Sequence, residues 1–200
     1  MVEVTEENGR PRVGIIVGST RPGRKAEDVA KWVYEIARRR GDAAYELVDL
    51  AEFALPALDE PIPPSMGRYA QEHTRRWAAK IGSLDAFVFV TPEYNHSTSG
   101  ALKNAIDYLY AEWNNKAAGF VSYGSAGGVR AVEHLRLVLA ELQVATVRAQ
   151  AALYLTADFE NYRTFRPDPS REKSVAAMLD QLVAWGNALR PLRAARGPSE

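Results

Sequence analysis

The chain has 200 residues, of which 46% are hydrophobic and 25% are charged, a composition that predicts one globular domain over 1–200 and excludes a disordered or collagen-like chain. Its 25 basic and 25 acidic side chains balance, so no general attraction to nucleic acid or to an anionic membrane is expected. The absence of cysteine excludes disulfides, cysteine-ligated zinc, iron–sulfur clusters and thiolate nucleophiles.

Short apolar runs alternate along the chain with segments whose apolar residues recur at helical spacing. In chain order, the pattern predicts strand 12–18, helix 27–40, strand 45–50, loop 51–67, helix 69–82, strand 85–92, helix 99–110, strand 117–124, helix 129–142, strand 145–153 and helix 172–189. The loop contains four prolines, which a helix interior does not tolerate. Residues 1–10 and 191–200 are expected to be flexible tails.

Alternating strands and helices indicate βαβ units, and therefore a parallel sheet with helices on both faces. Five strands with about five helices match the smaller doubly wound α/β fold, in which ligands bind beyond the carboxyl ends of the strands. The loops that follow the first, third and fourth strands are therefore the candidate site.

The first of these loops, 18–25, runs from a strand into the start of a helix and carries hydroxyls and cations suited to a phosphate. Ser19 and Thr20 can donate hydrogen bonds, and Arg21 and Arg24 can donate charge-assisted ones. The loop matches neither the P-loop pattern nor the dinucleotide glycine pattern, which favours a mononucleotide phosphate without magnesium. A solvated turn with surface cations is the alternative.

The second loop, 91–100, combines one aromatic ring with many hydrogen-bonding side chains, as a flat heteroaromatic ligand requires. Tyr94 could equally be half-packed on the core, and one of the residues 97–99 could be a helix N-cap. His96 is a candidate for catalysis, although no other histidine lies near it in the sequence. His73 and His134 are interpreted as ordinary helix positions, because the spacing of the histidines fits no metal motif.

The third loop, 123–128, contains three glycines, which allow the backbone to approach a ligand closely. Tyr123 stands where a nucleophile elbow needs glycine, so a serine hydrolase is not supported. A tight strand-to-helix turn is the alternative for this loop.

The segments GSTRPGR, TPEYNHSTSGALKNAIDYLYAEW and SYGSAGG together resemble the NADPH-dependent FMN reductase family, in its STRPGR subgroup. The resemblance covers most of residues 12–150, including the Leu-Pro-rich loop at 56–61. It implies a flavodoxin-like, doubly wound, five-stranded parallel sheet with helices on both faces, with FMN and NADPH as cofactors. Many members have Ser and Asn just after the arginine of the first loop, where this chain has Pro22 and Gly23.

Carried over by position, the resemblance implies three groups of FMN-binding residues. The phosphate would be held by Ser19, Arg21, Gly23 and Arg24. The isoalloxazine would be lined by Pro92, Glu93, Tyr94 and Asn95 on one side and by Gly124, Ser125 and Gly127 on the other. Ser97 and Thr98 would lie near the ribityl chain or the phosphate.

The implied activity is that of an oxidoreductase that passes electrons from NAD(P)H through FMN to a flavin, quinone or azo-type acceptor. No acid–base side chain is obligatory for this chemistry, so no catalytic residue is named. A non-enzymatic electron carrier on the same fold and a scaffold that has lost turnover are the alternatives. Carriers of that kind tend to be acidic, unlike this chain.

The expected partners are a small-molecule acceptor and further copies of the chain, as a homodimer or a dimer of dimers. The resemblance implies the homodimer, and the aromatic residues Tyr108, Tyr110 and Trp113 are taken as support for it, with packing on the domain's own core as the alternative. The sequence contains no apolar segment of signal-peptide type. It also contains no apolar run long enough to span a membrane. A cytoplasmic protein is therefore expected.

Overall fold

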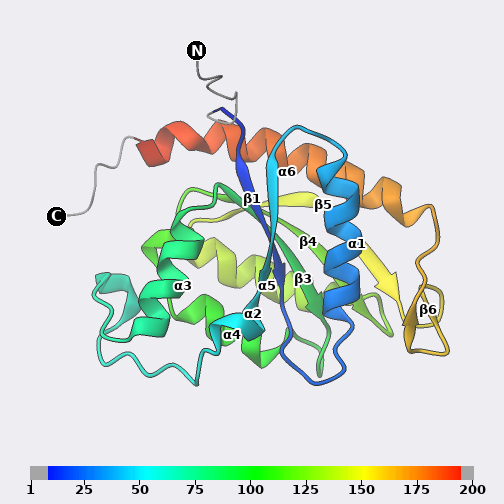
Figure 1. Cartoon of the computed structure of the whole chain (residues 1–200), viewed down its shortest axis with the longest axis horizontal. Coiled ribbons are helices and arrows are strands. Elements are labelled where there is room, and N and C mark those ends of the chain that lie inside the picture. The colour runs from blue at the N-terminus through cyan, green and yellow to red at the C-terminus, as the bar shows by residue number, and fades with distance from the viewer. Residues whose placement is uncertain (1–8, 195–200) are drawn as a thin grey trace, which may run out of the picture.

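The computed structural model describes residues 9–194 and contains one five-stranded parallel sheet (Figure 1). The strand order is β2 (Ala44–Asp49), β1 (Arg12–Val17), β3 (Ala86–Pro92), β4 (Ala117–Gly124) and β5 (Ala145–Tyr154). Strands β3 and β4 are buried at every position, as expected for central strands that are covered on both faces. The predicted flavodoxin-like, doubly wound α/β fold is confirmed.

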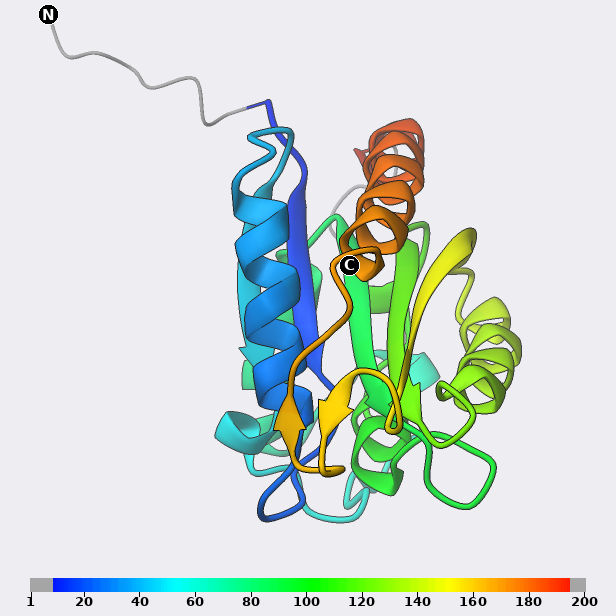
Figure 2. The same ribbon diagram turned by 90° about the vertical axis from the view of Figure 1, so that its right-hand side faces the viewer.

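Helices cover both faces of the sheet (Figure 2). One face carries α1 (Ala26–Arg38) and α6 (Arg171–Ala194), and the other carries α3 (Glu72–Gly82), α4 (Gly100–Asp107) and α5 (Val129–Glu141). Alternate residues of each strand point to opposite faces, so the chain has two apolar layers. Both layers end at the same edge of the sheet, where the strand-to-helix loops emerge.

The layer beneath α3, α4 and α5 is rich in aromatic rings. Trp77 and Trp113 are fully buried, and their indole N–H groups donate to carbonyls of α4 at Ala105 (2.8 Å) and Ile106 (3.1 Å). Tyr108 is fully buried as well, and Tyr110 packs against the same layer. The aromatic residues taken as support for a subunit interface therefore cover the domain's own core, and that interpretation of them was wrong.

The structure contains several short helices and strands that the sequence pattern does not predict. The expected loop 51–67 contains α2 (Leu50–Phe53) and the 3-10 turn η2 (Pro64–Met66), a second 3-10 turn η3 (Ala111–Trp113) follows α4, and β6 (Phe159–Glu160) pairs with β7 (Thr164–Phe165) in a hairpin. These elements are too short for periodicity to reveal them. Asp49 starts α2 by accepting a hydrogen bond from the Ala51 N–H at 2.9 Å.

The last helix is longer than expected. It continues through residues 191–194, which the sequence assigned to a tail, because Arg193 donates to the Asn115 carbonyl (2.7 Å) and pairs with Asp85. The remaining expected tail residues, apart from 9 and 10, lie outside the described residues. Within 9–194, no helix is both long and apolar enough to cross a membrane.

Lys116, at the amino end of β4, is 3% exposed. Its ammonium donates to the Ile81 carbonyl (2.6 Å) and to the Gly82 carbonyl (3.3 Å) at the end of α3. Burial, together with the nearby charge of Arg193, lowers the pKa of Lys116 to about 7. The unfolded chain keeps this proton up to about pH 10.4, so it binds more protons than the folded protein between these values.

We therefore expect the free energy of unfolding to rise with pH between about 7 and 10, because a pKa difference of one corresponds to about 1.4 kcal/mol. Lys116→Met should flatten this rise, whereas Lys103→Met, which removes an exposed lysine from α4, should leave it intact. Urea unfolding at several pH values measures both. Parallel pH profiles for Lys116→Met and the parent protein would contradict the prediction.

Candidate functional site

The predicted site loops lie together at the carboxyl edge of the sheet, after β1, β3 and β4. The first two meet through Gly18, whose N–H donates to the Val90 carbonyl at 2.8 Å. A Cβ atom at Gly18 would lie 2.6 Å from that carbonyl oxygen. Only glycine allows this close approach, which brings the ends of β1 and β3 into contact.

The first loop is built around a tight turn. The Arg24 N–H donates to the Arg21 carbonyl at 3.0 Å, with Pro22 second and Gly23 (φ 69°) third in the turn, the pattern of a type II turn. Arg24 donates to the Ser19 carbonyl (2.8 Å) and pairs with Asp49 at the end of β2. The guanidinium of Arg24 thus holds the loop in shape.

Arg21 differs from Arg24, because it is exposed and makes no ion pair within residues 9–194. Its guanidinium lies 5.9 Å from the centre of the Tyr94 ring. The buried Ser19 hydroxyl is 3.1 Å from the Tyr94 hydroxyl. The hydroxyls of Ser19 and Tyr94 and the unpaired guanidinium of Arg21 lie close together just before α1. Together they form a set of donors suited to a phosphate group.

The second loop begins with a two-residue turn. Tyr94 and Ser97 exchange backbone hydrogen bonds of 2.9 and 3.1 Å, with Asn95 (φ 49°) and His96 (φ 74°) between them. Left-handed conformation at both central residues is the signature of a type I′ turn, which suits asparagine well. Histidine, like asparagine, is one of the few non-glycine residues that adopt this conformation fairly often.

Residues 97–99 connect this turn to α4. Ser99 is the N-cap of α4, and its hydroxyl accepts from the Leu102 N–H (3.1 Å) while donating to the Gly18 carbonyl (2.5 Å). The Thr98 hydroxyl is 2.8 Å from that of Thr91. The Ser97 hydroxyl is 2.9 Å from Nδ1 of His134 on α5.

His134 lies on a helix, as predicted, and its ring contacts the second loop through Ser97. Its ring centre lies 6.2 Å from that of His96. The sequence did not reveal this proximity, because Ser97 and His134 are 37 positions apart. His73 lies elsewhere, 3.0 Å from a carboxylate oxygen of Asp59. Among the described residues, no group of three or more potential metal ligands occurs.

Glu93 connects the second loop to the third. Its N–H donates to the Tyr123 carbonyl (3.0 Å), and its nearly buried carboxylate pairs with Arg130 and accepts from the Arg130 N–H (3.3 Å) at the start of α5. The negative charge is favourable there, because the first turn of a helix presents unpaired N–H groups. The carboxylate of Glu93 is therefore directed at α5, and its backbone borders the site.

The third loop also depends on glycine. Gly127 (φ 70°) donates to the Gly124 carbonyl at 3.1 Å and accepts from the Ser122 hydroxyl at 2.7 Å. Gly128 is left-handed too, and a Cβ atom there would lie 2.8 Å from the Tyr123 nitrogen. Ser125, in the middle of the loop, is exposed. The loop is thus a compact turn whose backbone faces the same edge as Pro92 and Asn95.

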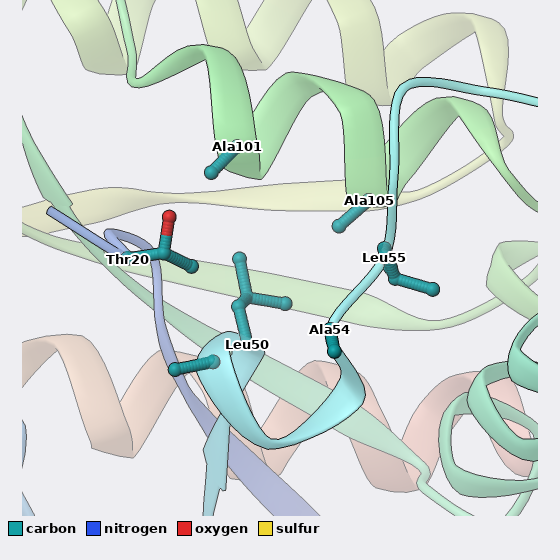
Figure 3. Close-up of a pocket in the computed structure, with 7 residues that line it drawn as sticks. Thr20, Leu50, Ala54, Leu55, Ala101 and Ala105 are labelled. Carbon is teal, nitrogen blue, oxygen red and sulfur yellow. The ribbon is translucent and has the colours of Figure 1, made fainter.

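An apolar cavity of about 390 Å³ adjoins the first loop (Figure 3). Its walls come from the loop, from α2 and the chain after it, and from one side of α4: Thr20, Leu50, Ala51, Ala54, Leu55, Ala101 and Ala105. The α2 wall was not predicted from the sequence. Thr20 contributes the one side-chain hydroxyl in this lining.

The sequence profile described as NADPH-dependent FMN reductase matches residues 11–157. An NAD(P)H-dependent FMN reductase of Schizosaccharomyces pombe is 38% identical over 189 residues, which cover 94% of this chain and 88% of the relative. A quinone reductase of Pseudomonas putida is 33% identical, with 86% of this chain and 93% of the relative covered.

Solved structures agree on the fold. The flavoenzyme FerB of Paracoccus denitrificans, described as an NAD(P)H:(acceptor) oxidoreductase, superposes with a TM-score of 0.68 at 24% identity. The match covers 89% of this chain and 98% of that one.

Proposed function

This chain belongs to the NADPH-dependent FMN reductase family, and we propose that it transfers electrons from NAD(P)H through a bound FMN to a small-molecule acceptor. The observation that carries the proposal is the contact between Ser19 and Tyr94. It joins a phosphate-type loop to a loop suited to a flat ring, at the edge where this fold binds ligands.

The phosphate of FMN would bind at the start of α1. Ser19, the Tyr94 hydroxyl and the guanidinium of Arg21 would supply donors, together with backbone N–H groups at the start of α1. Arg24 stabilises this loop through its hydrogen bond to the Ser19 carbonyl and its ion pair with Asp49. One phosphate loop without the dinucleotide glycine pattern favours FMN over FAD.

The isoalloxazine would lie between the second and third loops. Pro92, the Glu93 backbone, Tyr94 and Asn95 would border it on one side, and Gly124, Ser125 and Gly127 on the other. Ser97 and Thr98 would face the ribityl chain. The Glu93–Arg130 pair supports this arrangement, because it fixes the distance between the two loops.

FMN held by these residues would supply the redox chemistry, which is uptake of a hydride from the nicotinamide and release of the electrons to the acceptor. The protein's residues bind and orient the reactants, because hydride transfer needs an approach of about 3–3.5 Å. The backbone N–H groups near 93–95 and 124–126 would stabilise negative charge at the ring edge. NADPH and the acceptor would use the same ring face in turn.

The acceptor would be a small molecule such as a quinone, as the similarity to a quinone reductase suggests. The alternative of an electron carrier without turnover is disfavoured by the reductases among the relatives. Zero net charge disfavours it as well, since carriers of that type tend to be acidic.

The homodimer would form through the surface between α4 and α5. A groove of about 480 Å³ lies there, with Lys103, His134 and Leu137 in its lining, and Leu137 is 75% exposed. An exposed leucine next to an apolar groove is typical of an interaction surface. The groove also includes Ser97 and Thr98, so a second copy would cover one wall of the flavin site.

The release of the cofactor by heat, followed by chromatography, tests the proposed function. FMN is the expected species, and the purified protein should oxidise NADPH when a quinone is supplied. Recovery of FAD would overturn the cofactor assignment. A colourless protein that fails to bind added FMN would overturn the function.

Arg21→Ala should weaken FMN binding roughly ten- to a hundredfold, through loss of a charge-assisted hydrogen bond to the phosphate. The free energy of unfolding of the FMN-free protein should change by less than about 0.5 kcal/mol, because Arg21 is exposed. Arg148→Ala, which removes an exposed guanidinium from β5, is the matched control. Equal FMN affinity of the Arg21 variant and the parent would show that the phosphate binds elsewhere.

Light scattering at micromolar concentration should give twice the chain mass or a multiple of it. Leu137→Glu should shift the population toward monomer, because it places a charge in the apolar contact. Leu192→Glu, at an exposed leucine on the opposite face, should leave the mass unchanged. A monomeric mass for the parent protein would rule out the dimer.

A further inference from the structure

The hairpin β6–β7 is an addition that the five-stranded sheet does not need. It lies at the same end of the molecule as the three site loops (Figure 2). Phe159 at its start packs on Tyr123, with ring centres 5.9 Å apart, and Tyr123 directly precedes the glycine loop. The hairpin therefore forms part of the rim of the proposed flavin site.

The base of the hairpin is rigid. Asp158 is fully buried, and its carboxylate accepts hydrogen bonds from the Tyr154 N–H (2.7 Å), the Asp168 N–H (3.2 Å) and Nε of Arg171 (3.0 Å). Phe165 packs edge-on against Trp32 of α1 at 5.6 Å. The tip of the hairpin is thus held at a fixed place on the rim.

The tip presents an aromatic ring to solvent. Tyr162 is 64% exposed and left-handed (φ 58°), next to Asn161, which is left-handed as well (φ 50°). A bulky residue with positive φ is uncommon, because its Cβ is crowded by the backbone. Within residues 9–194, the Tyr162 ring stacks on no other ring, so core packing does not account for it.

Two arginines lie close to Tyr162 in the sequence of the hairpin. Arg163 follows Tyr162 directly and makes no ion pair in the described part of the chain. Arg166 is 79% exposed and reaches one carboxylate oxygen, on Glu160, only at 4.0 Å. The Arg166 N–H donates to the Asp158 carbonyl at 2.9 Å, so its backbone is fixed to the rigid base.

We propose that this hairpin binds the adenosine end of NADPH, with the adenine stacked on Tyr162 and the 2′-phosphate held by Arg163 and Arg166. The inference rests on the proposed function, because it concerns how that nicotinamide substrate is recognised. An exposed aromatic face suits a purine, and exposed guanidinium groups suit a phosphate monoester. The location of the hairpin is consistent with this role. If the nicotinamide lies at the glycine loop 123–128, the rest of the dinucleotide must extend across the rim of the flavin site, where the hairpin lies.

The test uses FMN-loaded protein with a quinone as acceptor and compares the KM values for NADPH and NADH. The double variant Arg163→Gln with Arg166→Gln should raise the KM for NADPH about ten- to a hundredfold, without changing that for NADH, which lacks the phosphate. Tyr162→Ala should raise both KM values by the same factor, since both nucleotides carry adenine. Arg148→Gln on β5 is the matched control and should change neither value.

Calorimetry supplies a readout independent of turnover. Adenosine 2′,5′-bisphosphate should bind the parent protein more tightly than adenosine 5′-monophosphate, and the double variant should abolish the difference. Equal KM shifts for both nucleotides in the double variant, or no preference for the bisphosphate in the parent, would overturn the inference while leaving the reductase function intact. A parent protein that oxidises neither nucleotide would overturn both.

Discussion

The contact between the ends of β1 and β3 is the constraint on which the rest of the site depends. Gly18 approaches Val90 so closely that any side chain would collide with a backbone carbonyl. The approach lets the Ser99 hydroxyl, which caps α4, reach the Gly18 carbonyl, and it lets the Tyr94 hydroxyl reach Ser19. A backbone contact at the ends of two buried strands thus sets the spacing of the candidate site loops.

Contacts within the chain therefore fix the positions of the three site loops relative to one another. Glu93 extends the arrangement to the third loop, because its carboxylate pairs with Arg130 and its N–H binds the Tyr123 carbonyl. Arg24 and Asp49 stabilise the first loop from the side of β2. Chemistry that the cofactor supplies needs such positioning more than it needs acid–base groups, which agrees with a site whose charged residues mostly pair with one another.

The sequence predicted those features whose signals are local. The buried strands and the loop that leads from the first strand into the first helix each depend on neighbouring residues, so the local pattern sufficed. The pairing of Glu93 with Arg130 and the contact of Ser97 with His134 each join residues 37 apart, and only the folded chain brings them together. The hairpin at 159–165 was missed because two-residue strands carry no periodicity, and Tyr108 was misplaced because an aromatic residue serves a core as well as an interface.

We propose that one flavin site, formed by these three loops, serves the nicotinamide and the acceptor in turn. Anaerobic addition of NADPH to the FMN-loaded protein, followed at about 450 nm, where oxidised flavin absorbs, tests it most directly. We expect NADPH to bleach the flavin without an acceptor, and a quinone added afterwards to restore the colour. A flavin that stays oxidised until the acceptor is present would contradict it, because both reactants would then have to bind at once.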